Sequence, residues 1–115
     1  DIPSLLLASE VLREKLFLRL HEELPYHLTV ETEKWETKKD GSVRIEQTVY
    51  VRRDGQKAIV LGKGGQTMKE IGSEARRELE EMFERRVHLF VFVKVRKNWK
   101  EDPERYRMLG LDYKA

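Results

Sequence analysis

The sequence predicts an α+β fold in which a three-stranded mixed sheet carries helices on one face. Apolar residues recur with helical spacing in residues 8–24 and 68–83, and they alternate with polar residues in three shorter stretches. A hairpin signal joins the first two of these stretches, whereas a helical segment separates the last two. The 115 residues fit one domain, because compact domains most often hold about 100–150 residues.

The first helix is expected to begin after residues 1–7, which are predicted to be a linker. Ser4 or Ser9 can cap this helix, and Pro25 ends it. The apolar residues of its buried side recur at every fourth position: Ala8, Leu12, Leu16 and Leu20.

Two strands follow, in residues 28–33 and 43–52, and each alternates apolar with polar side chains. Between them stands Asp40-Gly41, a strong hairpin signal, so the two strands are predicted to be antiparallel neighbours. A third strand at residues 87–96 follows a helical crossover and can therefore lie parallel to the second. On the sheet face away from the helices we expect four aromatic residues, packed against the C-terminal segment around Trp99 and Leu109: Trp35, Tyr50, Phe90 and Phe92.

The crossover is predicted to contain a short helix at residues 57–61, a glycine-rich loop and a long amphipathic helix. Gly72 interrupts the long helix, which predicts either a close approach of another backbone or a slight bend. After the third strand, Asp102-Pro103 starts a short helix that Gly110 stops. The domain is thus expected to span residues 8–98, followed by a C-terminal extension at 99–115.

Composition excludes several classes of protein. The chain has no cysteine, which rules out disulfides, a thiolate nucleophile and sulfur-based zinc sites, and its three histidines fit no metal motif. No apolar run approaches the roughly 18 residues that span a bilayer. We therefore expect a cytoplasmic chain that is not an enzyme, with no catalytic residues, no metal and no cofactor.

The net charge is +2, but acidic and basic side chains are concentrated in separate segments of the chain. Residues 1–33 carry three basic and seven acidic side chains, whereas residues 34–63 carry eight basic and four acidic ones. A basic block on one face allows a nearly neutral protein to bind a polyanion. A solvated surface of mixed charges explains the same counts, so charge alone leaves both interpretations open.

The loop Gly62-Lys63-Gly64-Gly65 is the most informative feature of the sequence. Glycines let a backbone approach a ligand closely, and the free amides at the start of the next helix favour an anion. Lys63 adds a full positive charge. A nucleotide-binding P-loop requires Gly-Lys-Ser/Thr, but Gly65 is followed by Gln66-Thr67, and the third glycine of a dinucleotide motif is also missing. The sequence therefore favours a phosphate backbone over a mononucleotide.

This loop and its flanks resemble the G-x-x-G signature of the KH family of single-stranded RNA binders, whose loop clamps about four nucleotides by their backbone. A helix and a strand ahead of a β-α-α-β core resemble the type II form of this fold. The chain is similar, over nearly its whole length, to the C-terminal KH domain of the Era family of bacterial ribosome-assembly GTPases. The segments that carry this resemblance are residues 8–15, Glu23 to Tyr26, Asp54 to Lys57, Val60 to Gly72, Ser73 to Arg76, Met82-Phe83, Val87 to Leu89, and Val93 to Val95 with Trp99 behind them.

The resemblance implies recognition of the 3′ end of small-subunit ribosomal RNA during 30S maturation, with the small ribosomal subunit as partner. Residues 1–7 would then link to a missing upstream GTPase domain, and the chain would act as a monomer; peripheral contact of the parent protein with a membrane stays open. The expected RNA-binding residues are Gly62, Lys63, Gly64, Gly65, Gln66, Lys69, Lys57, Ile59, Val60 and Arg76. Ile59 and Val60, with Ile71, are candidates for an apolar floor under the bases, and ordinary core is the alternative for all three. Arg76 can equally pair with Glu80.

An alternative function is a KH-like scaffold for protein contacts, through Leu5 to Leu7 or the acidic first helix.

Overall fold

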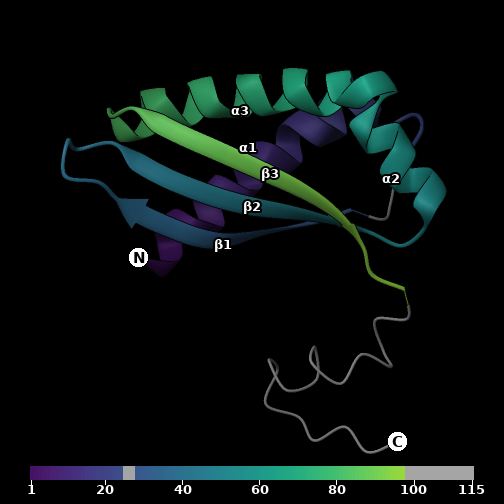
Figure 1. Cartoon of the computed structure of the whole chain (residues 1–115), viewed down its shortest axis with the longest axis horizontal. Coiled ribbons are helices and arrows are strands. Elements are labelled where there is room, and N and C mark those ends of the chain that lie inside the picture. Colours follow the sequence, from purple (N-terminus) through teal and green to yellow (C-terminus); the bar gives the residue numbers. More distant parts are fainter. Residues whose placement is uncertain (25–27, 98–115) are drawn as a thin grey trace, which may run out of the picture.

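The computed structural model describes residues 1–24 and 28–97. Figure 1 shows the strands of one sheet beside the long helices, with a short helix at one end of the sheet. The elements are α1 (Ile2–Leu20), β1 (Thr29–Thr37), β2 (Val43–Val51), α2 (Asp54–Leu61), a 3₁₀ turn η1 (Lys63–Gly65), α3 (Gln66–Phe83) and β3 (Val87–Val95). The sheet order is β1-β2-β3, with β1 antiparallel and β3 parallel to β2, which confirms the predicted mixed sheet. The predicted C-terminal helix and the boundary at residue 98 lie outside the described residues.

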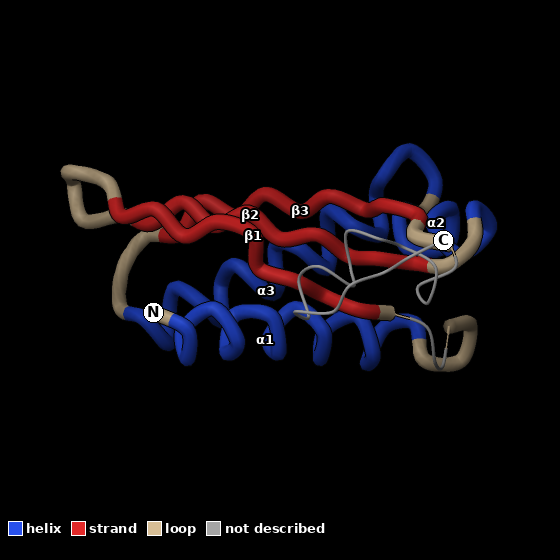
Figure 2. The backbone as a smooth tube through the Cα atoms, turned by 90° about the horizontal axis from the view of Figure 1, so that it is seen from below, coloured by secondary structure: helices blue, strands red, loops and turns tan. Residues whose placement is uncertain are grey.

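Helices α1 and α3 cover one face of the sheet, as seen edge-on in Figure 2. The core lies between these two layers, because each strand turns its alternate apolar residues toward the helices. Its largest fully buried apolar side chains come from both helices and strands: Leu12, Leu16, Val43, Ile45, Val49, Val51, Val60, Ile71, Leu79 and Val87. The face away from α1 and α3 carries Phe90 and Phe92, which are 40% and 48% exposed.

Helix α1 begins earlier than the sequence suggested. Residues 2–7, expected to be a linker, form its first turns, and Asp1 rather than a serine caps it: the Asp1 carboxylate accepts a hydrogen bond of 2.8 Å from the Ser4 amide. Pro3 suits this position, because the first helical turn needs no amide donor. Ser9 instead lies inside the helix, where its hydroxyl donates to the Leu5 carbonyl at 3.1 Å.

A small polar cluster joins α1 to the sheet. The Thr32 hydroxyl of β1 donates to the Leu5 carbonyl at 3.0 Å and accepts from the Gln47 side-chain amide of β2 at 3.1 Å. The Ser9 hydroxyl lies 2.7 Å from that of Thr32. Gln47 is fully buried, and its bond to Thr32 offsets part of the cost of burying its amide, whose oxygen has no hydrogen-bond partner among the described residues.

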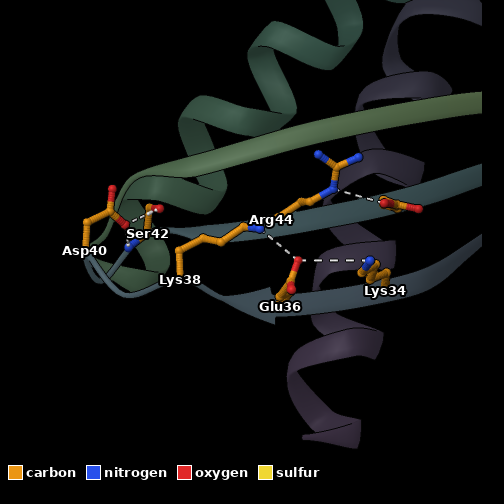
Figure 3. Close-up of polar contacts among 7 residues, drawn as sticks. Lys34, Glu36, Lys38, Asp40, Ser42 and Arg44 are labelled. Carbon is orange, nitrogen blue, oxygen red and sulfur yellow. Dashed lines mark hydrogen bonds and ion pairs between the residues drawn. The ribbon is translucent and has the colours of Figure 1, made fainter.

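The β1–β2 hairpin confirms the prediction made from Asp40-Gly41. Gly41 has a φ of 88°, and the Asp40 carboxylate accepts hydrogen bonds from the Ser42 hydroxyl at 2.6 Å and from its amide at 2.9 Å. These bonds lower the pKa of Asp40 below its ordinary value. Figure 3 shows the turn and, beside it, Lys34 and Lys38 directed toward Glu36.

A β-bulge displaces Trp35 from its predicted face. The pairing register shifts between Thr32 and Lys34, so the alternation of β1 is interrupted at Glu33. Trp35 therefore lies opposite Ile45 on the helix side and makes an edge-on contact with Phe83 of α3, with ring centroids 5.0 Å apart. The expectation that Trp35 shares the open face with Phe90 is wrong. Glu33 accepts a hydrogen bond of 2.8 Å from the Tyr50 hydroxyl, and burial together with this bond raises the pKa of Tyr50 to about 12.

Gly72 gives a first test of the fold. A Cβ added at this position would meet no heavy atom within 4 Å, so the predicted close approach of another backbone is absent. Gly72→Ala should therefore raise the free energy of unfolding by about 0.5–1 kcal/mol, because alanine restricts the unfolded chain and favours a helix. Thermal unfolding followed by circular dichroism should show Tm raised by roughly 4 °C. An unchanged or lower Tm would contradict this account.

Glu80 gives a second test, at the join between α3 and β3. Its carboxylate accepts from the Val87 amide at 2.9 Å and pairs with Arg76 at 2.8 Å; these two contacts, the amide first, hold the pKa of Glu80 below its ordinary value of 4.5. Such a depressed folded-state pKa contributes stability above the unfolded pKa, and this contribution is lost as pH falls through the folded one. At pH 7, Glu80→Gln should lower the free energy of unfolding by roughly 1 kcal/mol.

The pH dependence separates this effect from a general loss of charge. In denaturant titrations, the difference between wild type and Glu80→Gln should shrink steadily below pH 4.5. Glu81, an exposed carboxylate of the same helix with no hydrogen bond in the described part of the chain, is the matched control. A Glu81→Gln variant that loses as much stability as Glu80→Gln would refute the assignment.

Candidate nucleic-acid interface

Helix α2 and the beginning of α3 hold the glycine loop between them, as the sequence predicted. The start of α2 is fixed by Gln56, whose side-chain oxygen accepts from the amides of Arg52 at 2.9 Å and Arg53 at 3.1 Å. Its other end is fixed by Val60, which is fully buried in the core, and by a 2.9 Å bond from the Gly62 amide to the Ala58 carbonyl. The loop therefore leaves from a rigid support.

Gly62 is the structural glycine of the loop. Its φ of 74° and ψ of 175° bring the chain back so closely that an added Cβ would lie 2.1 Å from the Thr67 hydroxyl oxygen and 2.5 Å from the Thr67 Cβ. No side chain fits there, because real Cβ atoms do not approach other atoms within 3.0 Å. Contact between Gly62 and Thr67 closes the turn from α2 into α3.

Gly64 and Gly65, by contrast, face open space. Both have positive φ, 61° and 77°, yet an added Cβ at either would meet nothing within 4 Å. The Gly65 amide donates to the Gly62 carbonyl at 3.0 Å, whereas no hydrogen bond ties the amides of Lys63 and Gly64 to another loop or side chain in the described part of the molecule. These amides precede the N-terminus of the 18-residue helix α3, where the helix dipole favours an anion.

Most cations of the basic block at residues 34–63 that are unpaired among the described residues belong to the segment that leads into this loop. In the hairpin, Lys34 and Lys38 pair with Glu36, and Arg44 pairs with Glu46 at 3.0 Å. Within the described residues, five cations of the basic block at 34–63 form no ion pair, and four of the five belong to the segment that leads into and forms the loop: Lys39, Arg52, Arg53, Lys57 and Lys63. Lys63 stands exposed between glycines, with no packing role.

The remaining predicted site residues fall into different environments. Gln66 and Lys69 are exposed in the first turns of α3, beside the loop; Gln66 donates to Glu70 at 2.9 Å, and Lys69 has no ion pair among the described residues. Lys57 and Ile59 are partly exposed on α2, and Ile59 also packs against the core. Arg76 forms the alternative pair with Glu80 that the sequence allowed.

Val60 lies in the core and not at the surface. It is 0% exposed, as is Ile71, because both point from their helices into the core. The candidate apolar floor is thus reduced to Ile59. Three further exposed cations that the sequence analysis did not single out are Arg52 and Arg53, which precede α2, and Arg77 of α3.

The described residues contain neither a cluster of metal-ligating side chains nor a helix suited to span a membrane. In residues 1–24 and 28–97, no three histidine or acidic side chains come together as metal ligands would. Among the helices of this same part of the chain, none has the length and apolar character needed to cross a membrane. The arrangement suits an extended anionic backbone held by amides and cations.

The chain is similar to known proteins over almost its whole length. Curated relatives named GTPase Era include that of Brucella suis biovar 1 (strain 1330), 66% identical over 113 residues, and that of Bradyrhizobium diazoefficiens, 58% identical over 113 residues. Both alignments cover 98% of this chain, but 36% and 37% of the relative. The chain thus spans little more than a third of these GTPases. The part of these relatives that aligns with this chain is their KH region.

Two solved structures match with a TM-score of 0.81 at 36% identity, over 98% of this chain and 38% of theirs. One is Aquifex aeolicus Era bound to GDP·AlF4⁻, and the other is Era in complex with MgGDPNP and nucleotides 1506–1542 of 16S ribosomal RNA. A family model described as KH domain matches residues 23–100. Because this match covers more than half of the chain and the observed type II topology agrees with it, the chain belongs to the KH domain family.

Proposed function

We propose that this chain is a single-stranded RNA-binding module whose loop at residues 62–65 holds the phosphate backbone. The observation that carries the proposal is the open glycine backbone at the start of α3, with the Lys63 and Gly64 amides free of other parts of the described chain. Phosphate oxygens accept hydrogen bonds from such amides, and the Lys63 ammonium adds a charge that can follow the strand. Lys57 and Ile59 precede the loop on α2, and Gln66 and Lys69 follow it in the first turns of α3. On this proposal, these side chains contact neighbouring nucleotides.

The specific target we propose is the 3′ end of small-subunit ribosomal RNA. Support comes from the solved Era complex with nucleotides 1506–1542 of 16S ribosomal RNA, whose aligned part is 36% identical to this chain and has the same fold. In the cytoplasm the domain would act as a monomer during 30S maturation. A GTPase domain upstream in the longer protein would govern access of the RNA, since the GTPase relatives are nearly three times as long as this chain.

A second candidate function is protein docking through α1. Its solvent side carries four large apolar residues that are more than half exposed: Ile2, Leu6, Phe17 and Leu18. They form two pairs, one near each end of the helix, and exposed apolar patches mark contact sites on soluble proteins. A pull-down that survives ribonuclease and ignores loop substitutions would favour this function over RNA binding.

Charge reversal in the loop tests RNA binding directly. The double variant Lys63→Asp/Gly64→Asp should abolish binding of a short single strand in fluorescence anisotropy, because two carboxylates would repel the phosphates that the loop is proposed to hold. Both positions are exposed and touch no core residue, so circular dichroism should show an intact fold. Wild-type affinity should fall as salt increases. Unchanged binding by the double variant would remove the proposal.

Alanine substitutions separate the structural glycine from the open one. Gly62→Ala should destabilise the fold by several kcal/mol, because its Cβ would overlap Thr67 in addition to taking an unfavourable positive φ. Gly64→Ala should lower the free energy of unfolding by about 1–2 kcal/mol, because only the positive φ opposes an alanine there. Urea denaturation measures both values. Equal losses at the two positions would show that the contact with Thr67 does not constrain the turn.

A further inference from the structure

A depression on the outer side of α3 continues from the loop. Its volume is about 290 Å³, and Arg19 at the end of α1 forms one wall. The other lining residues all belong to α3: Gln66, Lys69, Glu70, Ser73, Glu74 and Arg77. Gln66 directly follows the turn at Lys63–Gly65, so the depression begins where the loop ends. From Gln66 to Arg77 the helix rises about 16 Å, at about 1.5 Å per residue.

The acidic groups of the depression are already engaged. Glu70 accepts a hydrogen bond from Gln66 at 2.9 Å and one from Arg19, and these two contacts lower the pKa of Glu70 below its ordinary value. Glu74 also pairs with Arg19, at 3.9 Å. The negative charges of both carboxylates are therefore partly compensated from within the depression.

Two cations of the depression are left without such a partner. Within the described residues, neither Lys69 nor Arg77 forms an ion pair. They lie two helical turns apart, with the Ser73 hydroxyl between them, so all three follow one side of α3. Three cations against two carboxylates give the depression an excess positive charge next to a loop that already favours anions.

We propose that this depression is a second phosphate-binding subsite, which holds the backbone of an RNA strand that extends past the nucleotides at the loop. The inference rests on the proposed function of the loop. Lys69 and Arg77 would meet successive phosphates, and the Ser73 hydroxyl would donate to one of them. The site reads charge and not base sequence, so it lengthens the RNA footprint without adding specificity.

Strand length separates this subsite from the loop. Fluorescence anisotropy should compare a six-nucleotide pyrimidine-rich strand with the same strand extended by six nucleotides at its 5′ or at its 3′ end. Arg77→Gln should leave the affinity for the six-nucleotide strand unchanged and weaken binding of one of the extended strands by about threefold or more at low salt. The slope of log K against log salt for that strand should become shallower by about 0.7, the value for one single-strand phosphate contact.

Two further variants complete the test. Glu74→Gln removes a carboxylate from the depression and should tighten binding of the same extended strand. Arg13→Gln is the matched control: Arg13 is an exposed arginine of α1 that lines no part of the depression. If Arg77→Gln behaves like Arg13→Gln on both extended strands, or if extension adds no affinity, the subsite is refuted while the loop proposal stands. If wild type fails to bind even the six-nucleotide strand, the loop proposal itself fails.

Discussion

The contact between Gly62 and Thr67 is the constraint on which the site depends. With no Cβ at Gly62, the chain can fold back onto the first turn of α3 and leave Gly64 and Gly65 outside the body of the protein. The fully buried Val60 and Ile71 anchor the two helices on either side of this turn. An exposed loop is therefore held by two core residues and one close backbone approach, which keeps its amides in place before a ligand arrives and limits the entropy cost of binding.

Some cations of the molecule form ion pairs, and others have no such partner among the described residues. Several cations are neutralised where they serve the fold: Lys15 of α1 pairs with Glu78 of α3 at 2.6 Å, and Lys34 and Lys38 of the hairpin pair with Glu36. Around α2, the loop and the outer side of α3, several cations keep their charge uncompensated by the described residues. The net charge of the chain is small, so this local sorting, and not the total, determines where an anion is attracted.

Much of this could be predicted from the sequence, because strong local signals agreed with the tertiary structure. Alternation in residues 43–52 and the Asp40-Gly41 turn predicted the hairpin, and the glycine loop stood out by composition alone. Three details could not be predicted. The bulge at Glu33 reverses the face of Trp35, and no local signal marks it. The helix starts at Ile2 because Asp1 caps it, where two serines were equally plausible. Val60 was indistinguishable from Ile59 until the direction of α2 relative to the sheet was known.

The hydrogen bonds among Ser9, Thr32 and Gln47 affect how α1 can move. Apolar contacts alone tolerate sliding of a helix along a sheet, whereas these directional bonds allow one longitudinal position. The bonds lie within two turns of Ile2, at the N-terminal end of α1, where Ile2 and Leu6 are exposed. A force applied at that end of α1 would therefore move β1 and β2 together with the helix, and would not shift the helix along the sheet.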